Sequence, residues 1–340
     1  MTSNNKDKKR PVIIVDGMNI FVRHFMVNQA VNAKSEPIGG VVGFLKFLDN
    51  LLYRWSPGKL IVVWENGGAS PRRQKISSAY KANRGKLKPI TEQAEANAGM
   101  SSYLRSDHAN KAEQLSTLYQ LLKHTPICQI FLKDTECDDI IGYITKYLFK
   151  DDRMKMVVSN DKDFYQLLED DTVKIYDPAR KITLDNNYVK ETFGISARNF
   201  CLARTLVGDP SDNIEGVPGI GLKTVSKRFP AFLNEDKDLT IDEVLDSCRA
   251  ILKTKSGAKL KAPNDILQSE DVIRRNWKLM YLNSSNLSGS QIEKINGAIS
   301  MHEPKMDKMG MMKEISKAGL NIAFDFNNFS THLKQNLLYE

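Results

Sequence analysis

The chain has 340 residues, of which 41% are hydrophobic and 26% charged, and its formal net charge is +8. This composition is typical of a folded protein with one large domain or two smaller ones. The positive charge favours a polyanionic partner, nucleic acid first. The four cysteines form no CxxC pair, which argues against a zinc site or a disulfide framework and favours a reducing compartment. No apolar run approaches the roughly 18 residues of a membrane span. Residues 1–10 are polar, so we expect a flexible tail, no membrane contact and a cytoplasmic location.

Short apolar runs alternate with helical patterns in the first half of the chain. We expect helices at about 19–27 and 43–55, and strands at 12–15, 60–64, 127–132, 155–158 and 173–176. This alternation predicts an α/β fold with a mostly parallel sheet covered on both faces. Residues 84–112 are poor in large apolar side chains and predict a solvent-exposed, partly helical or mobile excursion. From about residue 196 the pattern is mainly helical. We therefore place an α/β domain at 11–195 and a helical region at 196–340.

Acidic residues follow four of the predicted strands. Each group alone fits the first turn of a helix, where acids complement the macrodipole. That explanation does not predict their convergence, whereas the carboxyl ends of parallel strands meet at one edge of a sheet. We therefore expect these side chains to lie together. They are Asp16, Glu65, Glu136, Asp138, Asp139, Asp161 and Asp163.

Crowded carboxylates need cations between them. Two unit charges about 4 Å apart cost roughly 4 kcal/mol at an effective dielectric near 20. All-oxygen ligands favour Mg²⁺ over zinc, and Mn²⁺ could substitute for Mg²⁺. The sequence contains no EF-hand loop, so Ca²⁺ is not favoured. Two such ions suit phosphodiester hydrolysis, because one lowers the pKa of the attacking water and the other stabilises the leaving oxygen. The five histidines do not cluster, so a nuclease with a histidine base is less favoured.

Residues 71–90 contain seven basic residues and no acid. A solvated helix face is the ordinary explanation of such a run, but seven uncompensated charges favour contact with nucleic acid. Tyr80 beside Lys81 adds a surface on which a base could stack. The basic residues are Arg72, Arg73, Lys75, Lys81, Arg84, Lys86 and Lys88.

Residues 206–224 read LVGDPSDNIEGVPGIGLKT. A helical turn would place Asp209 and Asp212 on one face. Three glycines then interleave with apolar residues before a helix predicted from residue 222. Backbone N–H groups at such a turn can bind a phosphate, although a plain turn between two helices also fits. The residues of this predicted phosphate-binding turn are Gly216, Gly219, Gly221 and Lys223.

Five motifs, taken in order, resemble those of the 5′-nucleases: VDGMN at 15–19, YKANRG at 80–85, ECDD at 136–139, SNDKDF at 159–164 and GDPSDNIEGVPGIG at 208–221. This family includes flap endonucleases, the 5′→3′ exonuclease domain of bacterial DNA polymerase I and the ribonuclease H of T4-type bacteriophages. The resemblance covers roughly residues 11–230. It implies a PIN-like sheet, a helical arch at about 71–112 and a helix–three-turn–helix containing a helix-hairpin-helix at about 206–229.

The resemblance also implies roles for individual residues. Lys81 and Arg84 would contact the scissile phosphate, with Asp138 in the catalytic metal site. Arg204 stands where some relatives carry Lys, so a phosphate contact is implied there too. Glu65 departs from the family's Asp, which leaves its coordination open. The helix-hairpin-helix would carry a K⁺ ion, and the metal carboxylates would be Asp16, Glu136, Asp138, Asp139, Asp161, Asp163, Asp209 and Asp212.

The function implied by the resemblance is a Mg²⁺-dependent 5′→3′ exonuclease and flap endonuclease with RNase H activity. It would be a monomer that removes RNA primers and 5′ flaps from DNA and RNA/DNA duplexes during replication. A single-stranded-DNA-binding protein or other replisome proteins would be its partners, in the bacterial cytoplasm if a phage encodes it. Two alternatives remain: a branched-DNA-binding protein without catalysis, and a PIN-like ribonuclease acting on RNA only. The basic residues Lys253, Lys255, Lys259 and Lys261 fit a solvated loop and a duplex contact equally.

Overall fold

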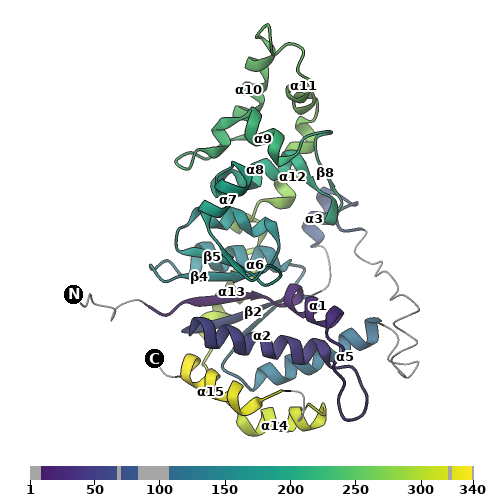
Figure 1. Ribbon diagram of the computed structural model, residues 1–340, viewed down its shortest axis with the longest axis vertical. Coiled ribbons are helices and arrows are strands. Elements are labelled where there is room, and N and C mark those ends of the chain that lie inside the picture. Colours follow the sequence, from purple (N-terminus) through teal and green to yellow (C-terminus); the bar gives the residue numbers. More distant parts are fainter. Residues whose placement is uncertain (1–8, 67–69, 83–106, 321–323, 339–340) are drawn as a thin grey trace, which may run out of the picture.

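The computed structural model describes residues 9–66, 70–82, 107–320 and 324–338. Its centre is a six-stranded sheet in the order β3-β2-β1-β4-β5-β6 (Figure 1). The first five strands are parallel and β6 pairs antiparallel with β5, so the predicted α/β fold is confirmed. The sequence did not predict β6, because it has only three residues and two of them are exposed. The strands are β1 (Val12–Asp16), β2 (Lys59–Asn66), β3 (Cys128–Lys133), β4 (Lys155–Val158), β5 (Val173–Asp177) and β6 (Ile182–Leu184).

Helices cover both faces of the sheet. One face, carrying Ile13 and Val62, packs against α1 (Gly17–Val27), α2 (Gly39–Trp55) and α5 (Asp107–Lys123). A Cβ atom on Gly40 would lie 2.8 Å from the Phe21 ring, so glycine permits the close packing of α2 on α1. The other face, carrying Ile14 and Val157, packs against helical elements from the middle of the chain. These are α6 (Cys137–Tyr143), the π-helix η1 (Ile144–Leu148), the 3₁₀ helix η2 (Lys162–Glu169), α7 (Asn186–Phe193), α8 (Ala197–Val207) and α13 (Gly289–Ser300).

The helical region predicted at 196–340 occupies two separate places. Four helices extend beyond α8, at the top of Figure 1, whereas α14 (Lys308–Lys317) and α15 (Phe326–Leu337) lie against α5 and α2 at the opposite end. Ile315 and Leu333 join the same core as Ile13, so the last two helices pack with the first part of the chain. The first four helices are α9 (Leu222–Arg228), α10 (Ile241–Leu252), α11 (Lys261–Gln268) and α12 (Glu270–Met280).

The basic segment enters this framework through one short helix. Helix α3 (Pro71–Ile76) packs on α12, and residues 77–82 follow it. Most of the predicted excursion at 84–112 lies outside the described residues, and residues 107–112 form the start of α5. Among the described helices, none has the length and apolar character that crossing a membrane requires.

Candidate active site

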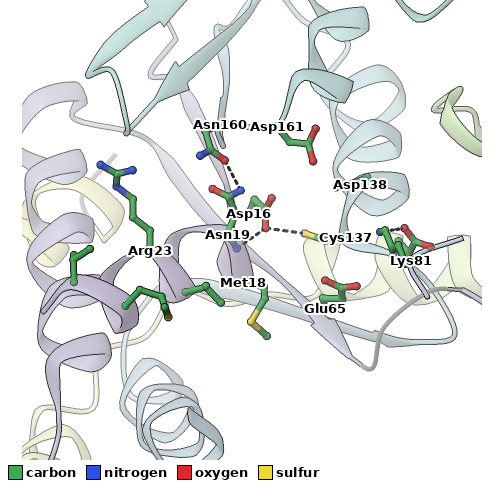
Figure 2. Close-up of a pocket in the computed structure, with 14 residues that line it drawn as sticks. Asp16, Met18, Asn19, Arg23, Glu65, Lys81, Cys137, Asp138, Asn160 and Asp161 are labelled. Carbon is green, nitrogen blue, oxygen red and sulfur yellow. Dashed lines mark hydrogen bonds and ion pairs between the residues drawn. The ribbon is translucent and has the colours of Figure 1, made fainter. Parts of the chain in front are cut away.

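A pocket of about 470 Å³ opens at the carboxyl edge of the sheet (Figure 2). Side chains of β1, β2, helix α1 and the segments after β3 and β4 line it, together with Lys81. The structure thus brings acids from separate parts of the sequence to one place. The acids that line the pocket are Asp16, Glu65, Glu136, Asp138 and Asp161.

Asp16 ends β1 and caps helix α1. Its carboxylate accepts hydrogen bonds from the Asn19 backbone N–H (3.1 Å) and the Ser159 hydroxyl (3.1 Å), and the residue is only 7% exposed. Burial, together with the negative charges of Asp161 and Glu65, raises the pKa of Asp16 to about 6. The carboxylate is therefore one that an added cation would stabilise strongly.

Burial and neighbouring negative charges also raise the pKa values of other acids near Asp16. Burial first, and then the charge of Asp161, raise the pKa of Asp138 well above its usual value. Burial and Asp161 also raise the pKa of Asp163 to about 7, although Arg204 opposes them. These carboxylates therefore repel one another across the pocket wall, and the protein itself supplies too little positive charge to offset the repulsion.

Arg204 binds the acids on the far side of Asp161. Its Nη2 lies 3.3 Å from Asp163 and 2.5 Å from Asp209. Arg204 is buried, so the structure gives it carboxylates as partners rather than the predicted phosphate. Asp209 caps the 3₁₀ helix η3 (Pro210–Asp212) by accepting from the Ser211 N–H, so the two acids Asp209 and Asp212 do not share one helical face as predicted.

Glu136 is surrounded by donors. Its carboxylate accepts from the Ser70 backbone N–H and the Tyr80 hydroxyl, each at 2.9 Å, and forms an ion pair with Lys81. Burial opposes ionisation, but Arg73 and Lys81 lower the pKa of Glu136 to about 2. Tyr80 is buried in these contacts and its hydroxyl also approaches Asp212 (3.4 Å), so its ring is not the exposed stacking surface that the sequence predicted.

Asp139 lies behind the pocket and pairs with Arg73. The two Nη atoms of Arg73 lie 2.5 and 2.9 Å from the two carboxylate oxygens, and its Nε donates to the Leu279 carbonyl. Arg73 is 2% exposed, and Asn286 also donates to Asp139. In the structure the charges of Asp139 and Arg73 neutralise each other in the interior. The metal contact of Asp139 and the nucleic-acid contact of Arg73 stay predictions.

The other predicted nucleic-acid residues fall into three groups. Gly219 and Gly221 stand in open space before α9, and Lys223 is exposed beside them. Gly216 instead packs against the Val207 carbonyl, where a Cβ atom would lie 2.0 Å away. Arg72 is partly exposed and donates to the Lys278 carbonyl, whereas Arg84 lies outside the described residues.

The oxygen donors of the pocket suit a divalent ion. The donor set is oxygen-rich, which fits Mg²⁺ or Mn²⁺, and a bound cation would offset the burial and repulsion that raise the pKa values of Asp16 and Asp138. In the described part of the chain, however, no three His, Cys, Asp or Glu side chains are already grouped to hold a metal. The residues fit the ions chemically, and their side chains would have to close onto them.

Comparison with known proteins decides the family. Residues 11–194 match the family model described as "5′-3′ exonuclease, N-terminal resolvase-like domain". The chain belongs to the 5′-3′ exonuclease family. It is 25% identical to a 5′-3′ exonuclease of Buchnera aphidicola over 80% of this chain and 94% of that protein. It is 30% identical to DNA polymerase I of Bacillus subtilis over 75% of this chain and 26% of the polymerase. Bacteriophage T5 5′-exonuclease shares the fold with a TM-score of 0.64 and 22% identity, over 93% of this chain and 100% of that one.

Several lining residues of this nuclease were not predicted. Asn19, Arg23 and Asn160 border the pocket, and the Asn19 amide donates to Asn160 Oδ1 at 2.6 Å. Asn19 and Arg23 lie one helical turn apart on α1, directly after Asp16, so helical spacing from the VDGMN motif could have identified Arg23. Asn160 belongs to the SNDKDF motif, but it carries no charge and was therefore not selected as a site residue.

The raised pKa values predict how the metal-free nuclease responds to pH. Asp16 binds its proton more tightly folded than unfolded, so the free energy of unfolding should fall as pH rises from about 4 to about 7. The expected loss from Asp16 is on the order of 3 kcal/mol. Glu136 has the opposite sign, and its contribution is lost as pH falls towards about 2.

Denaturant titrations in EDTA at about pH 4 and about pH 7 measure this difference. Mg²⁺ should restore stability at the higher pH, because a bound cation replaces the missing protons. Equal stability at both values in EDTA would show that the pocket carboxylates do not repel one another as described.

Proposed function

We propose that the protein is a divalent-metal-dependent 5′-nuclease that removes 5′ flaps and RNA primers from branched or nicked duplexes. The observation that carries this proposal is the pocket of carboxylates from separate strands with Lys81 at its border. The family relationship supports it. So do two fold neighbours, a T5 5′-exonuclease with bound divalent metal ions and a T5 flap endonuclease in complex with DNA and metal ions.

Four carboxylates are the proposed ligands of the ions: Asp16, Asp138 and Asp161, with Glu65 reaching in from β2. Bound Mg²⁺ or Mn²⁺ would supply Lewis acidity and an activated water. Glu136 acts by a different route, since it holds Lys81 and Tyr80 next to the pocket. The Lys81 ammonium is then placed to neutralise charge on the phosphate being cleaved. Three further acids extend the acidic region beyond these ligands: Asp163, Asp209 and Asp212. Arg204 forms ion pairs with Asp163 and Asp209.

The turn between α8 and α9 is the proposed duplex grip. Gly219 has φ +72° and no atom within 4 Å of a Cβ position, so the backbone there is accessible to a phosphate group. Lys223 and Lys227 are exposed on the following helix. Contacts of this kind read the backbone and not the bases, which gives selectivity for structure. A K⁺ ion at this turn remains part of the proposal, as do RNase H activity and replisome partners.

Labelled 5′ ends of three chemistries test the function. We expect cleavage of an all-DNA 5′ flap and of an RNA-primed 5′ end on DNA, and little cleavage of an all-RNA duplex. Activity should require Mg²⁺ and disappear in EDTA. A covalently closed duplex without a 5′ end is the control.

Two outcomes would contradict the proposal in different ways. Equal cleavage of the all-RNA duplex would indicate a ribonuclease. Tight flap binding without cleavage at any Mg²⁺ concentration would indicate a branched-DNA-binding protein.

A further inference from the structure

A second pocket, of about 410 Å³, lies between helices α1 and α2 and the turn that joins β5 to β6. It borders the first pocket, because Arg23 lines both. In Figure 2 the Arg23 side chain stands on α1, away from the carboxylates. The residues of the second pocket used below are Arg23, His24, Phe47, Arg54, Tyr176 and Lys181.

Positive charge dominates this pocket. Three of its lining residues are cations, and no carboxylate is among the described residues that line it. Arg23 and Lys181 are exposed, and within the described chain neither forms an ion pair. This is the reverse of the first pocket. Cations of one sign in a concave surface concentrate anions there.

The aromatic wall fixes one of these cations. The Arg54 guanidinium lies 5.3 Å from the centre of the Tyr176 ring and 5.2 Å from that of Trp55. Its Nη1 also lies 3.5 Å from the Tyr176 hydroxyl, and Phe47 stacks on Tyr176. A guanidinium held in this way loses little freedom when it binds an anion, and its planar fork matches phosphate oxygens.

His24 supplies an independent observation. Its Nε2 is buried and has no hydrogen-bond partner in the described structure. Burial, and then the neighbouring Arg23, lower the pKa of His24. Buried polar atoms are nearly always paired. His24 lines the second pocket, so an unsatisfied polar atom lies in the wall of this pocket.

We propose that the second pocket binds a phosphate group of the nucleic-acid substrate, one step along the strand from the carboxylate pocket. This inference rests on the proposed function for the identity of the anion. The shared chemistry is a phosphate held by two or three cations over an aromatic floor. We assign this phosphate to a backbone phosphodiester of the bound strand, and a free phosphate, such as that of a released mononucleotide, is the alternative that the test separates. With the phosphodiester bound, the pocket would hold the nucleic acid against the edge where the carboxylates stand.

The test compares two double variants with the wild type in EDTA, where no cleavage occurs. Arg54→Gln/Lys181→Gln removes two cations of the pocket, and Lys294→Gln/Lys313→Gln removes two exposed lysines elsewhere. We expect the first variant to bind a 5′-flap duplex about tenfold more weakly than the control. The slope of log K against log salt should become shallower by roughly 0.9, the value for one lost phosphate contact.

The phosphate source is determined by ³¹P NMR titrations of inorganic phosphate and a 5′-mononucleotide. If the wild type binds these ligands and the first variant does not, while flap affinity is unchanged, the pocket binds free phosphate and the assignment to the nucleic-acid substrate is overturned. If flap affinity and both titrations match the control variant, the proposal is overturned. Failure of the proposed function is a separate result, because it appears as the absence of Mg²⁺-dependent cleavage by the wild type.

Discussion

Asp138→Asn is expected to lower the rate of Mg²⁺-dependent flap cleavage by about 10²–10³-fold, the equivalent of about 3–4 kcal/mol of transition-state stabilisation. Asp138 lines the pocket beside Asp16 and Asp161, and it stands in the first turn of α6. An amide keeps the shape of the side chain and removes the negative charge that would hold a divalent ion. Single-turnover cleavage of a labelled flap, with Mg²⁺ in excess, measures the change.

The same substitution should leave the fold intact. Burial and the charge of Asp161 raise the pKa of Asp138, so the neutral amide resembles a form that the metal-free protein already favours. We expect the thermal midpoint in EDTA to be unchanged or higher, and the response of the midpoint to Mg²⁺ to shrink.

Asp152→Asn is the matched control, because Asp152 is an exposed acid on the turn before β4. It should cleave as fast as the wild type. Full activity in Asp138→Asn would remove this residue from the metal site, whereas equal losses in both variants would show a nonspecific charge effect.

The sequence predicted that acids from separate strands meet at the carboxyl edge of the sheet. Asp16 and Asp161 follow short buried strands, and parallel strands of this kind leave little freedom in where their carboxyl ends point. The convergence of Asp16, Glu65, Asp138 and Asp161 on one pocket depends only on that geometry. Chain order and strand type were therefore enough for this part of the site.

The partners of the other charges could not be predicted in the same way. A basic run between residues 71 and 90 looks like a solvated or nucleic-acid-binding surface, but Arg73 turns inward to Asp139, 66 residues away. Tyr80 likewise turns towards Glu136 and Asp212. Composition within a window cannot show that α12 would cover Arg73, or that α14 and α15 would pack against α5 and α2. Such contacts follow from packing between distant segments.

Arg73→Met is expected to destabilise the folded protein by about 3–5 kcal/mol, the usual cost of leaving buried charges without their partner. Arg73 is the counter-ion of Asp139 and lies 3.3 Å from Glu136. Its loss would leave the repulsion between these two buried carboxylates without a compensating charge. The Leu279 carbonyl also loses its donor, which loosens the contact of α3 with α12. Denaturant unfolding at neutral pH measures the change in the free energy of unfolding.

Arg72→Met is the control, because Arg72 is adjacent, partly exposed and donates to the backbone carbonyl of Lys278. Its expected cost is below about 1 kcal/mol.

Salt dependence separates a structural role of Arg73 from the nucleic-acid contact predicted by its sequence context. A structural Arg73 leaves the slope of log K against log salt unchanged once the variant is folded, whereas a phosphate contact makes it shallower by roughly 0.9. Equal stability of the two variants would show that the Arg73–Asp139 ion pair does not stabilise the folded protein.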